Sequence, residues 1–118
     1  MEEKVITPQD LATEPVEIVR VKVDDKGGVM FIGSLTADEY TEWGDARNSS
    51  DPEARKTAAA GLIIKSLVKG MNDPTRIGTM DMVPLFRKAR IARTERLLKA
   101  VLKLNGINQP DEVEVKNA

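Results

Sequence analysis

The chain has 118 residues, which fits one domain with a modest hydrophobic core. It is 41% hydrophobic and 31% charged, the composition of an ordinary globular protein. It contains no cysteine and no histidine, which excludes disulfides, thiolate metal sites and histidine chemistry. No apolar stretch approaches the ~20 residues that a membrane-spanning helix needs. The first residues lack the pattern of a secretory signal, so we expect a protein of a reducing cytoplasm.

The net charge of −1 conceals an uneven distribution of charge along the chain. Residues 1–60 carry 13 acidic and 7 basic side chains, whereas residues 61–110 carry 3 acidic and 10 basic ones. The last eight residues are acidic again, with 3 acidic side chains and 1 basic one. Such a bipolar pattern favours self-association or binding to an oppositely charged partner.

A β-hairpin is predicted after a weakly ordered leader of residues 1–15. Within the leader, Thr7–Asp10 fits the start of a short helical turn, because threonine is a good N-cap and proline follows it. Residues 16–23 are rich in β-branched side chains, and residues 19–23 alternate between apolar and basic ones, which is strand periodicity. Two glycines in Asp24–Gly28 indicate a turn, and residues 29–32 resume the strand.

The next predicted element is a helix over residues 37–47. Thr36 and Glu39 fit a capping box, in which each side chain accepts a hydrogen bond from the backbone amide of the other residue. The spacing predicts that this helix buries Tyr40 and Trp43.

A longer amphipathic helix is predicted to begin after Ser50 or Asp51, either of which suits its N-cap. Apolar side chains recur every three or four residues over residues 60–71, which predicts the apolar face of this helix. Gly70 suits the C-cap of that helix. A loop is expected over residues 71–79.

A short helix is predicted next, with Asp81 as its N-cap and a proline in its first turn. Its expected buried face consists of Met82, Leu85, Phe86 and Ala89.

The last predicted helix covers residues 91–105 and presents an apolar side that includes Ile91. A bend is expected near Arg90, because the basic residues before it would fall on the apolar side of one straight helix. Gly106 and Ile107 fit a Schellman ending. A disordered polar tail is expected over residues 109–118.

These elements predict an α+β fold, mostly helical, in which an N-terminal β-hairpin packs on three to four helices. The folded domain is expected to span residues 16–108. The predicted core consists of Val19, Val21, Phe31, Ile32, Tyr40, Trp43, Leu62, Ile63, Leu67, Leu85, Phe86, Leu98, Val101 and Leu102.

The sequence holds no set of side chains that points to catalysis. The acidic pair Asp24-Asp25 lacks further oxygen ligands nearby, so a turn explains it better than a metal site. Gly27-Gly28 lacks the lysine and helix of a phosphate loop. The loop Asp73–Gly78 offers no nucleophile and base. We therefore expect no enzyme activity, no metal site and no cofactor.

The basic side chains of the last predicted helix are the feature that points most directly to a function. They share one side of the helix, and two further lysines lie outside the apolar stripe of the longer helix. Three interpretations stay open: a solvated helix face, contact with an acidic protein surface, and phosphate contacts of a small nucleic-acid-binding regulator. Nucleic acid is the least favoured partner, because no aromatic side chains are interleaved for base stacking. The candidate protein-binding residues are Arg93, Arg96, Lys99, Lys103, Lys65 and Lys69.

Three features in this order resemble a known family. Gly33–Glu39 leads a strand into the motif L-T-A-x-E before a helix, and Thr57–Ile63 is rich in alanine. Asp81 opens the closing helical segment, and a leucine-rich helix ends in Leu104–Ile107. Over residues 16–108 this pattern is similar to the tail assembly chaperones of bacteriophages with long, non-contractile tails, in the short form made before a frameshift.

The resemblance implies a protein made in the host bacterial cytoplasm and absent from the mature virion. Members of this family bind the tape measure protein, a long and largely helical rod, and keep it soluble until tail tube subunits polymerise around it. The resemblance therefore implies the tape measure protein as partner, with tail tube protein and a second copy of the chain as further candidates. No membrane association is expected, because no apolar stretch is long enough to span a bilayer.

Overall fold

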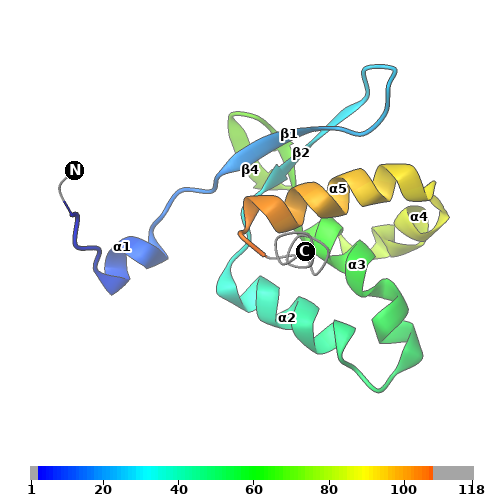
Figure 1. The fold of residues 1–118 in the computed structure, drawn as a ribbon, viewed down its shortest axis with the longest axis horizontal. Coiled ribbons are helices and arrows are strands. Elements are labelled where there is room, and N and C mark those ends of the chain that lie inside the picture. The colour runs from blue at the N-terminus through cyan, green and yellow to red at the C-terminus, as the bar shows by residue number, and fades with distance from the viewer. Residues whose placement is uncertain (1–2, 108–118) are drawn as a thin grey trace, which may run out of the picture.

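The computed structural model describes residues 3–107, so the predicted tail over residues 109–118 lies outside the described residues (Figure 1). Among the described residues, no helix is both long and apolar enough to cross a membrane. The fold is α+β with an N-terminal β-hairpin, as predicted. The elements in chain order are α1 (Pro8–Ala12), β1 (Ile18–Lys22), β2 (Val29–Gly33), α2 (Ala37–Arg47), α3 (Pro52–Ser66), β3 (Leu67–Gly70), β4 (Asp73–Arg76), η1 (Met80–Met82), α4 (Val83–Lys88) and α5 (Ile91–Leu104).

The four strands form one antiparallel sheet in the order β1-β2-β3-β4. The predicted hairpin of β1 and β2 is confirmed. Val19 lies opposite Ile32 and Val21 lies opposite Met30, and all four contribute to the core. Gly27 has a φ of 89° in the connecting turn, a backbone conformation that costs glycine little.

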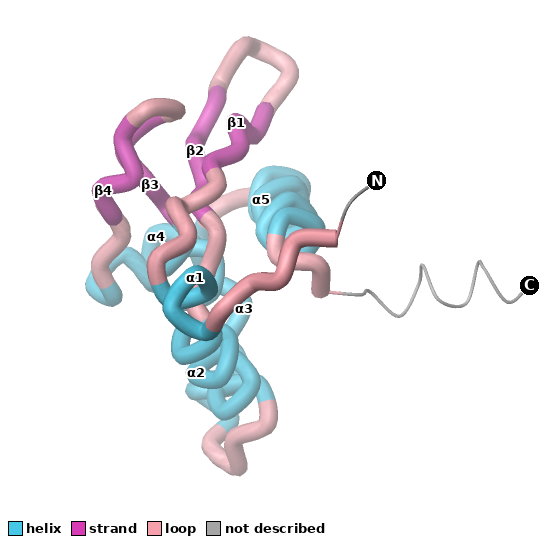
Figure 2. The backbone as a smooth tube through the Cα atoms, turned by 90° about the vertical axis from the view of Figure 1, so that its left-hand side faces the viewer, coloured by secondary structure: helices cyan, strands magenta, loops and turns pink. Residues whose placement is uncertain are grey.

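The core lies between this sheet and the helices α2, α3 and α5. Figure 2 shows the strands gathered at one end of the molecule, with α2 and α3 extending away from them. Aliphatic side chains dominate the core, as the scarcity of aromatic residues requires. The buried cluster consists of Val21, Ile32, Trp43, Ala58, Leu62, Ile63, Leu67, Leu97 and Val101.

Helix α2 begins and ends where the sequence predicts. The Thr36 hydroxyl accepts a hydrogen bond from the Glu39 amide at 3.2 Å, and the Glu39 carboxylate accepts one from the Thr36 amide at 2.9 Å. Trp43 is buried, as predicted. The prediction that Tyr40 is buried is wrong, because its side chain is 46% exposed.

The prediction that the longer helix continues up to a C-cap at Gly70 is wrong. Helix α3 has Asp51 as its N-cap, but it ends at Ser66, and the next four residues form β3. The backbone becomes extended at Leu67, where φ is −63° and ψ is 130°. Because Val68 then pairs with Phe31 of β2, the chain gains sheet hydrogen bonds while its side chains stay buried.

The expected loop over residues 71–79 contains strand β4, and Gly70 is not a helix cap. Gly70 pairs with Asp73 across a tight turn, so β3 and β4 form a second hairpin. The Asp73 carboxylate accepts hydrogen bonds from the amide and the hydroxyl of Thr75 at 3.0 and 2.6 Å. These contacts lower the pKa of Asp73, the hydroxyl contact most strongly.

The short helix differs from the prediction in its cap and its buried face. Residue Asp81 lies inside the 3₁₀ turn η1, and Met82 is the N-cap of α4 without a side-chain hydrogen bond. Phe86 packs against the core, but Leu85 is 67% exposed and Ala89 is also exposed.

The boundaries of α5 agree with the sequence. The chain bends at Arg90, which is the N-cap of α5. Gly106 has a φ of 68°, and the amides of Gly106 and Ile107 donate to the carbonyl oxygens of Lys103 and Leu102, the two bonds of a Schellman ending. The expectation that Ile91 joins the apolar side is wrong, since this side chain is 77% exposed.

We predict that Gly78→Ala destabilises the protein by about 1 to 3 kcal/mol. A Cβ atom at residue 78 would overlap the carbonyl oxygen of Ile64 at the end of α3, and that backbone atom cannot move aside. A matched control is Gly70→Ala, because nothing lies within 4 Å of a Cβ there. Chemical denaturation of both variants measures the difference. Equal stability of the two variants would contradict this account of Gly78.

Candidate protein-binding site

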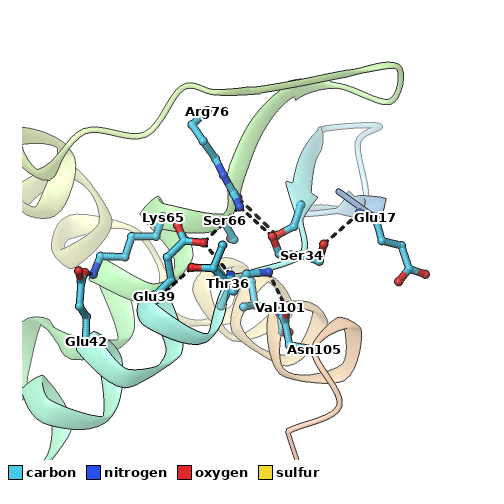
Figure 3. A network of polar contacts seen from close by, with 12 residues as sticks. Glu17, Ser34, Thr36, Glu39, Glu42, Lys65, Ser66, Arg76, Val101 and Asn105 are labelled. Carbon is cyan, nitrogen blue, oxygen red and sulfur yellow. Dashed lines mark hydrogen bonds and ion pairs between the residues drawn. The ribbon is translucent and has the colours of Figure 1, made fainter. Parts of the chain in front are cut away.

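The connection between β2 and α2 is held by Arg76 of β4 (Figure 3). The guanidinium of Arg76 donates to the carbonyl oxygen of Ser34 at 2.7 Å and to that of Gly33 at 3.5 Å. It also meets the Glu39 carboxylate at 3.4 Å. The Ser34 hydroxyl accepts a hydrogen bond from the Glu17 amide at 2.9 Å. One cation therefore fixes the sheet against the start of α2.

Asn105 fixes the same connection from the other side (Figure 3). Its side-chain oxygen accepts a hydrogen bond from the Leu35 amide at 2.8 Å. Its side-chain nitrogen donates to the carbonyl oxygen of Val101 at 2.7 Å, so the amide group is used at both ends. The end of α5 is thus held against the start of α2.

A cleft of about 600 Å³ lies between these two helix ends. One wall comes from α2 and the residues before it, and the other wall comes from the Schellman ending of α5. Its lining combines apolar, aromatic and hydrogen-bonding side chains. The lining residues are Leu35, Thr36, Ala37, Tyr40, Trp43, Arg47, Asn105, Gly106 and Ile107.

Three side chains of α2 form the aromatic wall of the cleft. The rings of Tyr40 and Trp43 lie 5.8 Å apart and tilted, and the guanidinium of Arg47 lies 4.4 Å from the centre of the Trp43 ring. Such cation–π and aromatic contacts orient large side chains before a partner binds. Tyrosine, tryptophan and arginine are also the residues most enriched at energetically important positions of protein interfaces. The cleft therefore exposes residue types that recur at protein interfaces.

The predicted basic side of α5 is partly occupied by the β1–β2 turn. Arg93 lies 3.8 Å from the carboxylate of Asp24, and Arg96 lies 3.3 Å from that of Asp25. The acidic pair therefore neutralises part of the positive charge on this side. Because both arginines remain partly exposed, they bind the turn only loosely.

The four candidate lysines do not gather at one place. Lys99 and Lys103 are exposed on α5, and within the described part of the chain they form no ion pair. Lys65 of α3 pairs with Glu42 of α2, and Lys69 is exposed on β3. The structure thus leaves two adjacent lysines on α5 and separates them from the other two.

Sequence reasoning missed the cleft because it assigned Tyr40 to the core. The available signal was the spacing of Tyr40, Trp43 and Arg47, which places all three on neighbouring turns of one helix face. The sequence alone did not show that the end of α5 stands opposite this face.

We predict that Arg76→Ala lowers the free energy of unfolding by about 2 kcal/mol, because the carbonyl oxygen of Ser34 and the partly buried carboxylate of Glu39 each lose one hydrogen-bonding partner. The matched control is Arg87→Ala. Arg87 pairs with Glu53 at the surface, and its loss should cost no more than about 1 kcal/mol. Urea denaturation measures both. The assignment fails if the two variants lose stability equally.

We also predict an acid-dependent contribution from Asp24. The backbone amides of Gly28 and Lys26, followed by Arg93 and Arg96, hold the pKa of its carboxyl below the ordinary value of 3.8. A carboxyl whose pKa is lowered by folding stabilises the protein fully above its unfolded-state pKa of about 3.9, and the contribution is lost as pH falls through the lower folded pKa.

Asp24→Asn should therefore be less stable than the parent near neutral pH and equally stable in strong acid. Denaturation midpoints measured from neutral pH downward give this comparison. A constant difference between variant and parent at every pH would contradict the prediction.

No protein-family model matches this sequence, and no curated protein matches it by sequence. The fold does match a solved structure, the tail assembly chaperone of bacteriophage HK97. The match has a TM-score of 0.58 and 17% sequence identity, and it covers 86% of this chain and 95% of that one. At this identity the match establishes a shared fold.

Proposed function

We propose that this protein is a bacteriophage tail assembly chaperone that binds the tape measure protein in the host cytoplasm and is absent from the finished virion. The observation that carries the proposal is the fold shared with the HK97 tail assembly chaperone over nearly the whole of both chains. The order of elements and the loose terminal motif of the sequence fit the same family.

The geometry of the α2–α5 cleft fits this role. A largely helical rod presents apolar side chains at helical spacing, and a partner recognises them with a groove between its own helices. The cleft offers such a groove, with Tyr40 exposed and Trp43 behind it. The two lysines of α5, Lys99 and Lys103, would meet acidic side chains beside the rod's apolar stripe. Tail tube protein is a second partner that the proposal allows.

The nucleic-acid alternative gains no support from the structure. Two of the four basic residues on α5, Arg93 and Arg96, face carboxylates of the β1–β2 turn. The same carboxylates would repel a phosphate backbone. They would therefore lower the affinity for nucleic acid, which depends on the number of phosphates that the protein neutralises.

The proposal is tested by co-expressing the protein with the tape measure protein encoded nearest to it. The expected result is that the tape measure protein stays soluble and co-purifies with the chaperone. Tyr40→Glu should reduce co-purification at least about tenfold, because it replaces an exposed aromatic ring of the cleft with a carboxylate.

Met71→Glu is the matched control, since Met71 is similarly exposed but lies on the β3–β4 turn. The proposed function is wrong if the parent protein neither co-purifies with the tape measure protein nor reduces its aggregation. If both variants lose binding equally, the α2–α5 cleft is not the binding site.

A further inference from the structure

The α2–α5 cleft is open in the part of the chain that the structure describes. Tyr40 is 46% exposed there, and its ring lies 5.8 Å from that of Trp43. An aromatic ring gains free energy when it is removed from water, so the cleft favours an occupant that covers Tyr40. The cleft volume of about 600 Å³ is typical of sites that enclose a small ligand, so a few residues of extended chain fit into it.

The described part of the chain ends in the wall of this cleft. Gly106 and Ile107 line the cleft, and the side chain of Asn105 accepts a hydrogen bond from the Leu35 amide of the opposite wall (Figure 3). The residues that follow Ile107 therefore begin at the cleft. A segment tethered so close to a site has a high effective concentration there, so even weak contacts can fill the site.

The C-terminal tail, defined as residues 108–118, carries apolar side chains that suit such a site. Val113 and Val115 are its two large apolar residues, and Glu114 separates them. In an extended chain, alternate side chains point to the same face, so the two valines would share one face and Glu114 would lie on the other. Valine also favours extended backbone. The tail can thus present an apolar face with a carboxylate opposite to it.

The cleft and the tail carry opposite charge. Arg47 is the one ionised side chain among the residues that line the cleft, and no ion pair joins it to another described residue. Residues 108–118 contain three acidic side chains and one basic side chain. An acidic segment that enters the cleft therefore meets a cation at the aromatic wall, and no described carboxylate lines the cleft to repel it.

The tail is long enough to reach Arg47. Helix α2 leads from the connection beside Asn105 to Arg47, and its 11 residues span about 16 Å. Glu114 lies seven residues after Ile107, a distance that an extended chain covers up to about 24 Å. The two valines beside Glu114 therefore fall within the length of the aromatic wall.

We propose that the C-terminal tail folds back into the α2–α5 cleft of its own chain and occupies it until a partner displaces it. Val113 and Val115 cover Tyr40, and Glu114 pairs with Arg47 at the rim. Tail and partner then compete for one site, so the tail lowers the apparent affinity for the partner in proportion to the fraction of open clefts. Occupancy of the cleft by the tail needs no partner, whereas this competition rests on the proposed function.

The first test measures the order of the tail by NMR relaxation of the full-length protein without a partner. The backbone amides of residues 112–115 should have order parameters of about 0.85 in the parent, the value of rigid backbone. Val113→Asp with Val115→Asp should lower them below about 0.6, because charged side chains replace the apolar face. Tyr40→Ala should have the same effect from the side of the cleft.

The ion pair is tested by exchanging its charges. Arg47→Glu should release the tail, and Arg47→Glu combined with Glu114→Arg should restore its order, because the exchanged pair attracts again. Two matched controls should leave the tail as ordered as in the parent. They are Asn117→Asp, which adds a charge to the tail outside its apolar face, and Met71→Asp, at an exposed apolar residue of the β3–β4 turn.

The proposal is overturned if residues 112–115 are mobile in the parent, or if the valine and tyrosine variants leave their order unchanged. It is also overturned if the order of the tail rises with protein concentration, because the tail then binds a second copy. An order that is constant on dilution supports binding within one chain.

The second test measures competition with the tape measure protein. Val113→Asp with Val115→Asp should co-purify with at least about threefold more tape measure protein than the parent does, and Asn117→Asp should match the parent. If the tail is ordered but neither parent nor variant binds the tape measure protein, the proposed function fails and occupancy of the cleft stands. If both bind it equally well, the competition is wrong and the proposed function stands.

Discussion

The hydrogen bond from Arg76 to the carbonyl oxygen of Ser34 joins parts of the chain that are 42 residues apart. The same guanidinium pairs with the carboxylate of Glu39. That carboxylate also accepts a hydrogen bond from the amide of Thr36 at the start of α2. One cation therefore connects the edge strand β4, the end of β2 and the N-terminus of α2. The orientation of α2, and with it the aromatic wall of the cleft, depends on this contact. Loss of the guanidinium would remove a hydrogen-bond donor from a partly buried carboxylate and two carbonyl oxygens, which would destabilise the fold.

The local elements could be predicted because their signals lie within a few residues. The capping box of Thr36 and Glu39 marks the start of α2, and Gly106 marks the end of α5 through its positive φ. Each signal satisfies backbone groups that any helix end leaves unpaired, so it acts independently of the rest of the fold. The hairpin of β1 and β2 follows the same logic, since its turn is short and rich in glycine.

The second hairpin could not be predicted because its cause is distant in the sequence. Leu67 and Val68 continue the apolar spacing of α3, and four residues are too few to separate helical from strand periodicity. Their conformation is decided by β2, which pairs with them and lies more than thirty residues earlier. The exposure of Tyr40 has a similar origin: the packing of α5 leaves an open cleft beside this residue that no pattern within α2 encodes.

The basic residues of α5 show why charge counted along a sequence overstates a binding surface. Arg93 and Arg96 face the acidic turn of the first hairpin, and the turn is itself held by amide hydrogen bonds to Asp24. The two arginines therefore pair with the turn of the first hairpin, while Lys99 and Lys103 remain exposed on α5. The α2–α5 cleft instead combines a preformed aromatic wall with the single cation of Arg47. At surfaces of this kind, buried aromatic and apolar side chains generally supply most of the affinity, and peripheral charges mainly set orientation.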